Sequence, residues 1–342
     1  MAKGFDHQLM ARAIALAKRS PQADPNPRVG CVIAKGATII AEGWHEGAGS
    51  AHAEVAALAK AGDDARGASA YVSLEPCNHT GKTGPCSQAL VAAGIKRVVF
   101  AQSDPNPVAV GGATYLREHG VIVESGLAVE EAKELNRYWN ASYLLGRPFV
   151  TWKVAASLDG RTAAANGTSQ WITGEEARRD VHELRRSAGA IIVGTGTVLA
   201  DNPRLTIREP DGRLAARQPL RVIVGKRKIP NNFRVFNDEA PTLQIGVQPV
   251  EVLAQLKARQ IHHAWLEGGS SLAAAFWTAG LIDEVVCYLA PALLGAGPNL
   301  IGNLGVADIE DCYRLDLKDV RQIGNDVRLI AKPKERMCLP ES

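Results

Sequence analysis

The sequence has little that would place the protein on a membrane or on a nucleic acid. No apolar run approaches the roughly 18 residues that a membrane span needs. The formal net charge is only +3 and no block of lysine and arginine occurs, whereas a nucleic-acid surface normally shows a basic patch. Residues 1–6 lack the apolar segment of a signal peptide. We therefore expect a soluble, cytoplasmic protein with no nucleic-acid or membrane partner, a reading that leaves room for a small phosphorylated substrate.

Cysteine is sparse as well, and its spacing does not suggest a disulfide framework. The six cysteines lie at positions 31, 77, 86, 287, 312 and 338. Two of them are better explained as metal ligands, so we expect a reducing compartment. The chain also lacks internal repeats and low-complexity segments, and at 342 residues it has room for two domains of roughly 100–200 residues each.

The segment from His45 to Cys86 carries the clearest chemical signal. It contains His52-Ala53-Glu54, then Pro76-Cys77, and finally Cys86. One histidine and two cysteines give three ligands and leave an open position, which describes a catalytic zinc site. Zinc lowers the pKa of water in that position, so hydroxide forms near neutral pH. Glu54 is then not needed as a zinc ligand, so its carboxylate can take a proton from the water and transfer it to a leaving amine.

This order of residues is the signature of zinc nucleobase deaminases, with one departure. The usual spacing between the two cysteines is two residues, whereas eight residues separate Cys77 from Cys86. The alternative interpretation is a partly buried histidine and two inert core thiols.

The first half predicts alternating helices and strands around this motif. A helix over 51–61 would hold His52 and Glu54 in its first turn. Residues two apart in the middle of a helix point in different directions, but the backbone of the first turn is not yet fully helical, so both side chains can face one pocket. Pro76 suits the first position of a helix, which would put Cys77 at a helix start, and Cys86 opens another helix. Both thiolates would then benefit from a helix dipole. The other expected elements are helices over 6–19, 87–93, 113–118 and 130–145, and strands over 29–33, 38–41, 70–74, 97–100 and 121–123.

The second half begins after Gly146-Arg147-Pro148, which looks like a domain junction. It repeats a pattern of strand followed by glycines, first at Gly194-Thr195-Gly196 and again at Gly268-Gly269. Bare backbone N–H groups in such turns can approach a phosphate. The third glycine of the dinucleotide fingerprint is missing, so we do not expect a Rossmann half. The alternative for each glycine pair is a tight turn.

Together the first-half motifs resemble the bifunctional riboflavin-biosynthesis deaminase/reductase family. They are Pro25-Asn26-Pro27-Arg28-Val29-Gly30, His52-Ala53-Glu54, Glu75-Pro76-Cys77-Asn78-His79 and Asp104-Pro105-Asn106-Pro107. The long spacing between the cysteines matches this family. The resemblance implies a cytidine-deaminase-like α/β/α domain over 1–147, with zinc on His52, Cys77 and Cys86 and with Glu54 as the catalytic residue.

The same resemblance implies a deaminase substrate pocket. Its lining would be Asn26, His45, His79, Lys82, Asp104 and Asn106. Lys82 suits a phosphate and Asn26 can hydrogen-bond ribose or base. Asn26 and Asn106 also stand before proline, a common loop setting, so each is alternatively a turn residue.

Second-half motifs resemble the reductase half of the same family. They are Lys153-x-Ala155-x-Ser157-Leu158-Asp159-Gly160, Ser169-Gln170-Trp171-Ile172-Thr173, Gly194-Thr195-Gly196-Thr197, Asp201-Asn202-Pro203-x-Leu205-Thr206-x-Arg208 and Glu267-Gly268-Gly269. The resemblance implies a dihydrofolate-reductase-like α/β domain over 148–332 that uses NADPH, followed by a loose tail over 333–342.

Position by position, the resemblance also implies the reductase contacts. The cofactor would contact Ala155, Trp171, Thr197, Asp201, Gly269, Ser270 and Ser271. The substrate would contact Ser169, Arg185, Leu205, Arg208 and Glu267. Arg185 and Arg208 suit a phosphate because guanidinium pairs with it at two points, although a solvated face is the alternative. The proton donor is left open among Lys153, Asp201 and Glu267.

The resemblance implies two consecutive reactions in riboflavin biosynthesis. Hydrolytic deamination of 2,5-diamino-6-(5-phosphoribosylamino)pyrimidin-4(3H)-one would be followed by reduction by NADPH, which gives 5-amino-6-(5-phosphoribitylamino)uracil. It also suggests a homo-oligomer, a dimer or larger. Two alternatives stay open: a zinc nucleoside or tRNA deaminase with an unrelated C-terminal domain, and a reductase with a relict zinc domain.

One segment departs from the family. After the strand at 221–224 the family usually carries an acidic residue and a small one, whereas this chain has Gly225-Lys226-Arg227-Lys228. The extra positive charge would favour a 2′-phosphate, and hence NADPH over NADH, or it marks a solvated turn.

Overall fold

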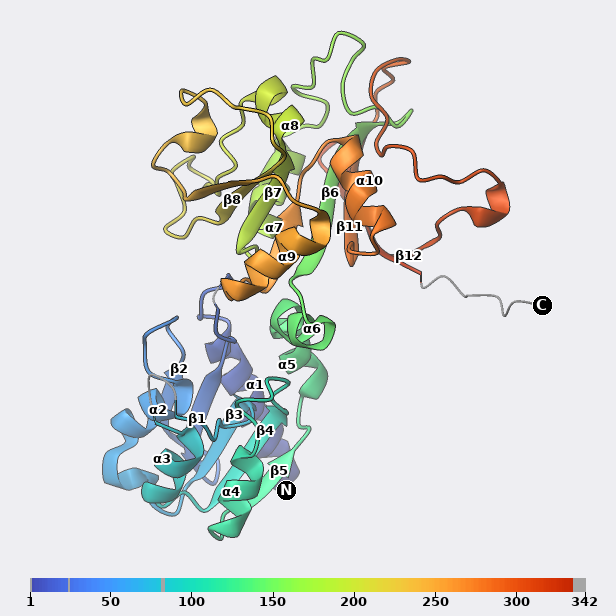
Figure 1. The fold of residues 1–342 in the computed structure, drawn as a ribbon. Helices are drawn as coiled ribbons and strands as arrows, with labels where there is room; N and C mark the ends of the chain where they lie inside the picture. The colour runs from blue at the N-terminus through green and yellow to red at the C-terminus, as the bar shows by residue number, and fades with distance from the viewer. Residues whose placement is uncertain (1, 24, 81–83, 335–342) are drawn as a thin grey trace, which may run out of the picture. The chain divides into compact units, whose positions relative to one another are not determined.

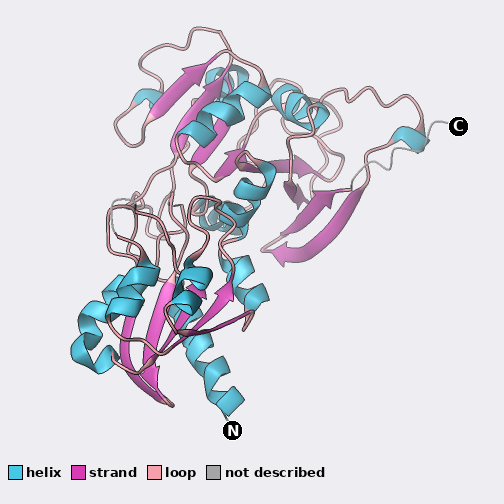
Figure 2. Cartoon of the chain, turned by 60° about the horizontal axis from the view of Figure 1, so that its bottom comes forward, coloured by secondary structure: helices cyan, strands magenta, loops and turns pink. Residues whose placement is uncertain are grey.

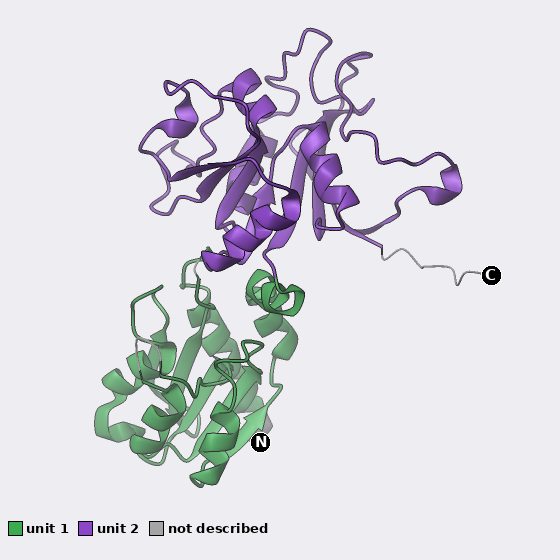
Figure 3. Ribbon diagram, in the orientation of Figure 1, with its two compact units in different colours: residues 1–146 green, residues 147–342 purple. Residues whose placement is uncertain are grey.

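A computed structural model of the chain describes residues 2–23, 25–80 and 84–334 (Figure 1). The chain divides into two compact units, unit 1 (residues 1–146) and unit 2 (residues 147–342) (Figure 3). The division follows Gly146, which ends the last helix of unit 1 in the left-handed conformation that glycine adopts easily (φ 67°). Within the described residues, no helix is both long enough and apolar enough to cross a membrane.

Unit 1 is built on a five-stranded sheet in the order β2-β1-β3-β4-β5 (Figure 1). Strand β1 is antiparallel to β2 and β3, whereas β3, β4 and β5 are parallel. The strands are β1 (Gly30–Lys35), β2 (Thr38–Trp44), β3 (Ser69–Leu74), β4 (Arg97–Gln102) and β5 (Ile122–Ser125). The helices are α1 (Ala2–Ala17), α2 (Ala53–Ala61), η1 (Gly62–Ala65), α3 (Cys86–Ala92), α4 (Gly112–Glu118), α5 (Val129–Leu135) and α6 (Arg137–Leu145).

Both faces of this sheet are buried, which explains its continuous apolar strands. Cys31 and Ile33 of β1 join one core with α2, α3 and α4. The alternate residues Val32 and Ala34 join a second core with α1 and α5. Unit 1 therefore has the three-layer α/β/α arrangement that was expected.

Two local predictions in unit 1 are wrong. The helix expected over 130–145 is two helices, α5 and α6, broken at Asn136 (φ −110°, ψ 24°). The side chain of Asn136 is buried and bonds both the N–H and the C=O of Arg28, at 2.8 and 2.9 Å. This long-range pairing fixes Asn136 outside helical geometry.

Cys77 does not begin a helix either, because residues 75–80 form a loop after β3. The loop backbone is held from two sides: Asn78 N–H donates to Ala109 O at 3.2 Å, and Cys77 O accepts from Ser87 N–H at 3.1 Å. These partners replace the hydrogen bonds that a helix would have made.

Unit 2 is built on an eight-stranded sheet in the order β12-β13-β11-β6-β10-β7-β8-β9, with helices packed on both faces (Figure 2). The six strands from β11 to β9 are parallel. At one edge β13 is antiparallel to β11, and β12 is antiparallel to β13. The strands are β6 (Phe149–Ser157), β7 (Ala190–Gly194), β8 (Leu220–Val224), β9 (Thr242–Ile245), β10 (His263–Leu266), β11 (Glu284–Ala290), β12 (Leu315–Ile323) and β13 (Asp326–Pro333). The helices are α7 (Glu175–Arg185), α8 (Thr195–Asp201), η2 (Arg234–Phe236), α9 (Pro249–Ala258), α10 (Ser270–Thr278) and η3 (Ile309–Asp311).

The parallel strands of unit 2 all end at one edge of the sheet, where α/β proteins bind ligands. At the other end of the chain, Pro333 pairs with Leu315, and Lys334 N–H donates to Arg314 O at 3.0 Å. The rest of the segment expected as a tail, residues 335–342, lies outside the described residues.

Candidate active sites

Unit 1 brings His52, Cys77 and Cys86 together. His52 Nδ1 lies 3.2 Å from Cys86 Sγ and 3.5 Å from Cys77 Sγ, and the three donor atoms all lie within 4.8 Å of one another. One imidazole and two thiols at this spacing form a donor set that zinc prefers, and three protein ligands leave a fourth position open. The residues therefore fit a catalytic zinc.

Local structure explains how each ligand reaches the site. His52 is the N-cap of α2 and has an extended backbone (φ −67°, ψ 157°), so it is not bound to helical geometry. Glu54, in the first turn of α2, can therefore face the same pocket as His52, although residues two apart on a helix normally diverge. Cys86 is the first residue of α3, after Pro85, and the Cys77–Ser87 hydrogen bond described above holds the two cysteine segments together.

The electrostatics of this pocket suit proton transfer. Burial, reinforced by the charge of Cys77, raises the pKa of Glu54 to about 7, and its side chain is almost fully buried. Hydrogen bonds from Cys86 and His52 lower the pKa of the Cys77 thiol to about 4. The same Cys77–Cys86 contact raises the pKa of Cys86.

Two residues expected in the deaminase substrate pocket lie beside the metal ligands. The ring of His45 is buried and meets the ring of His52 edge-on, with 5.8 Å between centroids. Its Nε2 lies 3.0 Å from Asn26 Nδ2, and its Nδ1 lies 3.1 Å from Ala51 O. His45 therefore links Asn26 to the start of α2.

The loop from Asp104 to Ala109 is joined to the loop of Cys77 by the hydrogen bond from Asn78 N–H to Ala109 O. Asp104 is buried, burial raises its pKa to about 6, and it accepts the N–H of Asn106 at 2.8 Å. Asn106 Oδ1 in turn accepts from Val108 N–H at 3.2 Å, the turn geometry that the proline context had suggested. His79 is half-buried, with a buried Nδ1 that has no hydrogen-bond partner among the described residues. Lys82, expected at the phosphate, lies outside the described residues.

Unit 2 has a cavity of about 350 Å³ that gathers eight of the predicted reductase residues. They are Lys153, Trp171, Arg185, Thr197, Asp201, Leu205, Arg208 and Glu267. Six cationic side chains line the cavity, at 153, 178, 185, 204, 208 and 234, against the two carboxylates of Asp201 and Glu267. Such a surplus of positive charge suits a phosphorylated ligand.

The carboxylate of Glu267 is ionised and is held in place by hydrogen bonds in this cavity. Arg185 donates to it at two points, at 2.7 and 2.5 Å, and Trp265 Nε1 donates at 2.5 Å. Burial alone would raise the pKa of Glu267, but the charges of Arg185 and Lys153 lower it to about 2. Burial lowers the pKa of Lys153, whose ammonium lies 5.9 Å from the centre of the Tyr288 ring.

The other predicted reductase residues are not among those that line the cavity. Ser169 Oγ donates to Asp201 Oδ1 at 3.0 Å, and Gly269 N–H donates to Thr197 Oγ1 at 3.2 Å. Gly269 is the N-cap of α10, which Ser270 and Ser271 begin. Ala155 lies on β6, opposite Tyr288 of β11.

The sequence did not lead us to predict several residues that line this cavity. Arg178, Val181 and His182 line the cavity together with Arg185, and all four come from α7. Their spacing of three, four and seven residues marks one helical face, so the sequence of α7 already contained the signal. Arg204 and Arg234 also line the cavity, but they come from irregular or 3₁₀ segments without a comparable pattern.

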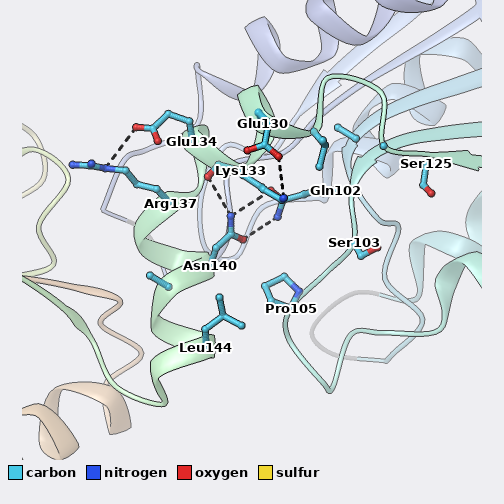
Figure 4. A pocket seen from close by; sticks show the side chains of 14 residues that line it. Gln102, Ser103, Pro105, Ser125, Glu130, Lys133, Glu134, Arg137, Asn140 and Leu144 are labelled. Carbon is cyan, nitrogen blue, oxygen red and sulfur yellow. Dashed lines mark hydrogen bonds and ion pairs between the residues drawn. The ribbon is translucent and has the colours of Figure 1, made fainter. Parts of the chain in front are cut away.

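Unit 1 has another cavity, of about 560 Å³, beyond the carboxyl ends of β4 and β5 (Figure 4). None of the residues predicted for the deaminase site lines it. Three pairs of its polar side chains interact with each other: Gln102 with Asn140, Lys133 with Glu130, and Arg137 with Glu134.

The chain matches two family models that divide it in the same way. Residues 148–329 match the RibD C-terminal domain, and residues 3–102 match the cytidine and deoxycytidylate deaminase zinc-binding region. The match over 148–329 makes the alternative of an unrelated C-terminal half wrong.

Curated relatives and solved structures cover nearly the whole chain. The riboflavin biosynthesis protein RibD of Mycobacterium tuberculosis H37Rv is 49% identical over 308 residues, which cover 89% of this chain and 90% of that protein. The Escherichia coli K12 protein of the same name is 41% identical over 360 residues, covering 95% and 98%. The structure of Acinetobacter baumannii RibD has a TM-score of 0.89 at 40% identity and covers 97% of this chain and 99% of its own.

A Thermotoga maritima structure agrees, with a TM-score of 0.85 at 34% identity over 97% of this chain and 99% of its own. It is described as a diaminohydroxyphosphoribosylaminopyrimidine deaminase/5-amino-6-(5-phosphoribosylamino)uracil reductase. The expected fold class, cytidine-deaminase-like followed by dihydrofolate-reductase-like, is thereby confirmed. The chain belongs to the RibD family of bifunctional riboflavin-biosynthesis proteins, in which a zinc-dependent deaminase domain precedes an NADPH-dependent reductase domain.

Proposed function

We propose that this chain deaminates 2,5-diamino-6-(5-phosphoribosylamino)pyrimidin-4(3H)-one and then reduces the product to 5-amino-6-(5-phosphoribitylamino)uracil. The observation that carries the proposal is the pair of sites in one chain. A buried carboxyl group lies beside a His-Cys-Cys cluster in unit 1, and a cationic cavity lies in unit 2. The first arrangement suits hydrolysis of an amine, and the second suits binding of phosphorylated molecules.

In unit 1, His52, Cys77 and Cys86 hold the zinc. Zinc bound there supplies Lewis acidity that brings the pKa of water close to neutral. Glu54 would take a proton from the attacking water and give one to the leaving amine, so that ammonia departs and oxygen replaces it on the ring. A general acid–base works best when its pKa lies near the working pH, and burial places that of Glu54 at about 7.

The rest of the unit 1 site orients the substrate. Asn26 and His45 form a hydrogen-bonded pair beside His52, and their amide and imidazole groups would contact the reacting ring. Asp104 and Asn106 face it from the loop after β4, and His79 has a buried Nδ1 with no partner among the described residues. Lys82 binds the substrate phosphate in this scheme.

In unit 2, Arg185 and Arg208 bind the substrate phosphate, and Glu267 holds Arg185 in position. NADPH, when bound, would supply a hydride for the ribosyl carbon. The bond from that carbon to the ring oxygen would break, and the oxygen would take a proton. Glu267 is a poor proton donor because its pKa of about 2 keeps it ionised. Lys153 is the better donor, because burial in the same cavity lowers its pKa and so makes its proton easier to release.

Trp171, Thr197 and Asp201 would hold the cofactor, together with Ala155 and the start of α10 (Gly269, Ser270 and Ser271). Thr197 and Asp201 line the cavity from α8, and Trp171 exposes its ring at the cavity, with the Arg178 guanidinium 4.6 Å from the ring centre. Ser169 and Leu205 complete the substrate side. This arrangement would bring hydride donor, phosphate site and Lys153 into one cavity.

The test uses the full chain loaded with zinc and the diaminopyrimidinone substrate, with and without NADPH. Ammonia should appear in both samples, and the ribityl product only in the sample with NADPH. Ammonia in neither sample, together with reduction of the separately supplied deaminated compound, would mean a reductase with a relict zinc domain. No product from either compound would contradict the proposal.

We also propose a homo-oligomer, a dimer or larger, in a reducing cytoplasmic setting. Leu317, Val320 and Val327 expose apolar side chains on the β12–β13 hairpin, and β12 is an edge strand of the sheet. A long apolar edge normally needs a cover, and a second copy would provide one. Sedimentation of the purified chain tests this.

A further inference from the structure

The departure at Gly225-Lys226-Arg227-Lys228 lies at the ligand-binding edge of unit 2. The turn follows β8, which runs beside β7 (Figure 1), and Gly194 is paired with Val224 in the ladder between the two strands. The turn is therefore adjacent to the Gly194–Thr197 segment. In open α/β sheets, ligands bind outside the carboxyl ends of parallel strands, which is where both segments lie.

The guanidinium of Arg227 lies against this neighbouring segment. Its Nε donates to Thr195 Oγ1 at 3.2 Å, and a Cβ added at Gly196 would come within 2.8 Å of its Nη2. Glycine at 196 therefore leaves room for the guanidinium. Within the described part of the chain, Arg227 has no other side-chain hydrogen bond, so its remaining N–H donors can meet a ligand.

The backbone of the turn is fixed before any ligand arrives. Gly225 has a φ of 132°, and a Cβ there would meet Thr195 Oγ1 at 2.8 Å. Gln244 Nε2 donates to Gly225 O at 3.1 Å and to Arg227 O at 2.8 Å. A cation on a fixed turn loses less freedom on binding than one on a loose loop.

The charge of the turn favours an anion over a hydroxyl group. Lys226 and Lys228 flank Arg227, and none of the three forms an ion pair with another described residue. The ribose 2′-hydroxyl of NADH is typically held by a carboxylate, whereas an arginine accommodates the 2′-phosphate of NADPH.

The turn is also continuous with the reductase cavity. Thr197, next along the chain from the Thr195–Gly196 contact, accepts the N–H of Gly269 and lines the cavity with Lys153 and Glu267. The cavity proposed for hydride transfer and Arg227 therefore lie along the same edge of the sheet. A dinucleotide with its nicotinamide in the cavity would direct its adenosine end toward this turn.

We propose that Arg227 binds the 2′-phosphate of NADPH and makes the reductase select NADPH over NADH. This inference rests on the reductase activity proposed above and assigns its cofactor preference to a residue in which the chain departs from its family. The guanidinium can pair with the phosphate at two points, an interaction that a lysine cannot reproduce.

The experiment measures binding rather than turnover, by titration calorimetry on the full zinc-loaded chain. The ligands are NADPH, NADH, adenosine 2′,5′-bisphosphate and 5′-AMP, so that each pair differs only in the 2′-phosphate. Arg227→Gln should weaken binding of NADPH and the bisphosphate by roughly tenfold to a hundredfold, with NADH and AMP unchanged. Arg227→Lys should fall between the two. Lys228→Gln removes the same charge from the same turn and should leave the NADPH-to-NADH ratio as in the wild type.

The outcomes separate this inference from the activity on which it rests. If the wild type binds NADPH and Arg227→Gln leaves the NADPH-to-NADH ratio unchanged, the inference is overturned and the reductase stands. Equal weakening of all four ligands also overturns it, because that result describes a structural role. If the wild type binds neither dinucleotide, the reductase proposal fails, and the inference fails with it.

Discussion

The Arg185 guanidinium and the Glu267 carboxylate form a two-point ion pair in the reductase cavity, with distances of 2.7 Å from Nε to Oε1 and 2.5 Å from Nη2 to Oε2. Both side chains are almost buried, at 13% and 12% exposure. The pair keeps Glu267 ionised. In the proposed function, Glu267 would therefore position Arg185 rather than donate a proton.

Glu267→Gln should destabilise the protein by about 3–5 kcal/mol, because it leaves the buried Arg185 charge unpaired. Urea unfolding at pH 7 measures the loss. Glu209→Gln provides a matched control, since Glu209 pairs with Arg186 in the same unit but is more exposed, and it should cost much less. Equal losses in the two variants would contradict the buried-pair interpretation.

His182 should make the stability of the protein depend on pH between about 6.5 and 4. Burial, and next the charge of Arg185, lower its pKa from 6.5 to about 4, so the folded state prefers the neutral ring. Because the unfolded chain takes up the proton first as the pH falls, this contribution is complete above pH 6.5 and is lost on the way down to pH 4. Urea unfolding of the wild type and of His182→Gln over this range should show a flatter profile in the variant. His7→Gln, at an exposed histidine of α1, is the control, and parallel profiles for wild type and His182→Gln would contradict the prediction.

Glu54→Gln should stop ammonia release while zinc and NADPH binding remain. The amide has nearly the shape of the carboxyl group but cannot accept and return the proton, so we expect a loss of about 10²–10⁴-fold in the deamination rate. Ammonia assay and metal analysis on one preparation check both halves of the statement. Glu131→Gln, at an exposed position in α5, should behave as wild type. Deamination at the wild-type rate in Glu54→Gln would refute the role.

Cys86→Ser should lose zinc and deamination together but retain reduction of the separately supplied deaminated compound. Cys86 lies within hydrogen-bond distance of His52 and begins α3, and a serine hydroxyl is a far weaker ligand for zinc than a thiolate. Metal analysis and NADPH oxidation measure the two effects. Cys312→Ser changes a cysteine of unit 2 outside both sites and should keep zinc. Full zinc content in Cys86→Ser would remove Cys86 from the ligand set.

The zinc site could be predicted from the sequence because its ligands and Glu54 belong to short sequence motifs. His52 and Glu54 lie two residues apart, and the structure brings both Cys77 and Cys86 to them. The conformation of Cys77 was not accessible, since Pro76 suits a helix start as well as a loop. The choice depends on partners at Ser87 and Ala109, which lie farther along the chain.

The separation in sequence between interacting residues also explains which other features could be predicted and which could not. The break at Asn136 depends on Arg28, 108 residues earlier, so no periodicity in 130–145 could reveal it. By contrast, Arg178 and His182 share a helical face with Arg185, and a helical projection of residues 175–185 would have found both. Arg234 lies in a 3₁₀ segment, and only the folded chain brings it to the cavity.

The central claim is that one chain carries two consecutive reactions, and a single progress curve tests it most directly. Ammonia and NADPH are followed together after the diaminopyrimidinone substrate is added to the zinc-loaded chain. The account predicts that ammonia release comes first, that NADPH oxidation follows after a lag, and that the two reach equal amounts. NADPH oxidation that precedes ammonia release, or that proceeds unchanged in Glu54→Gln with the same substrate, would contradict it.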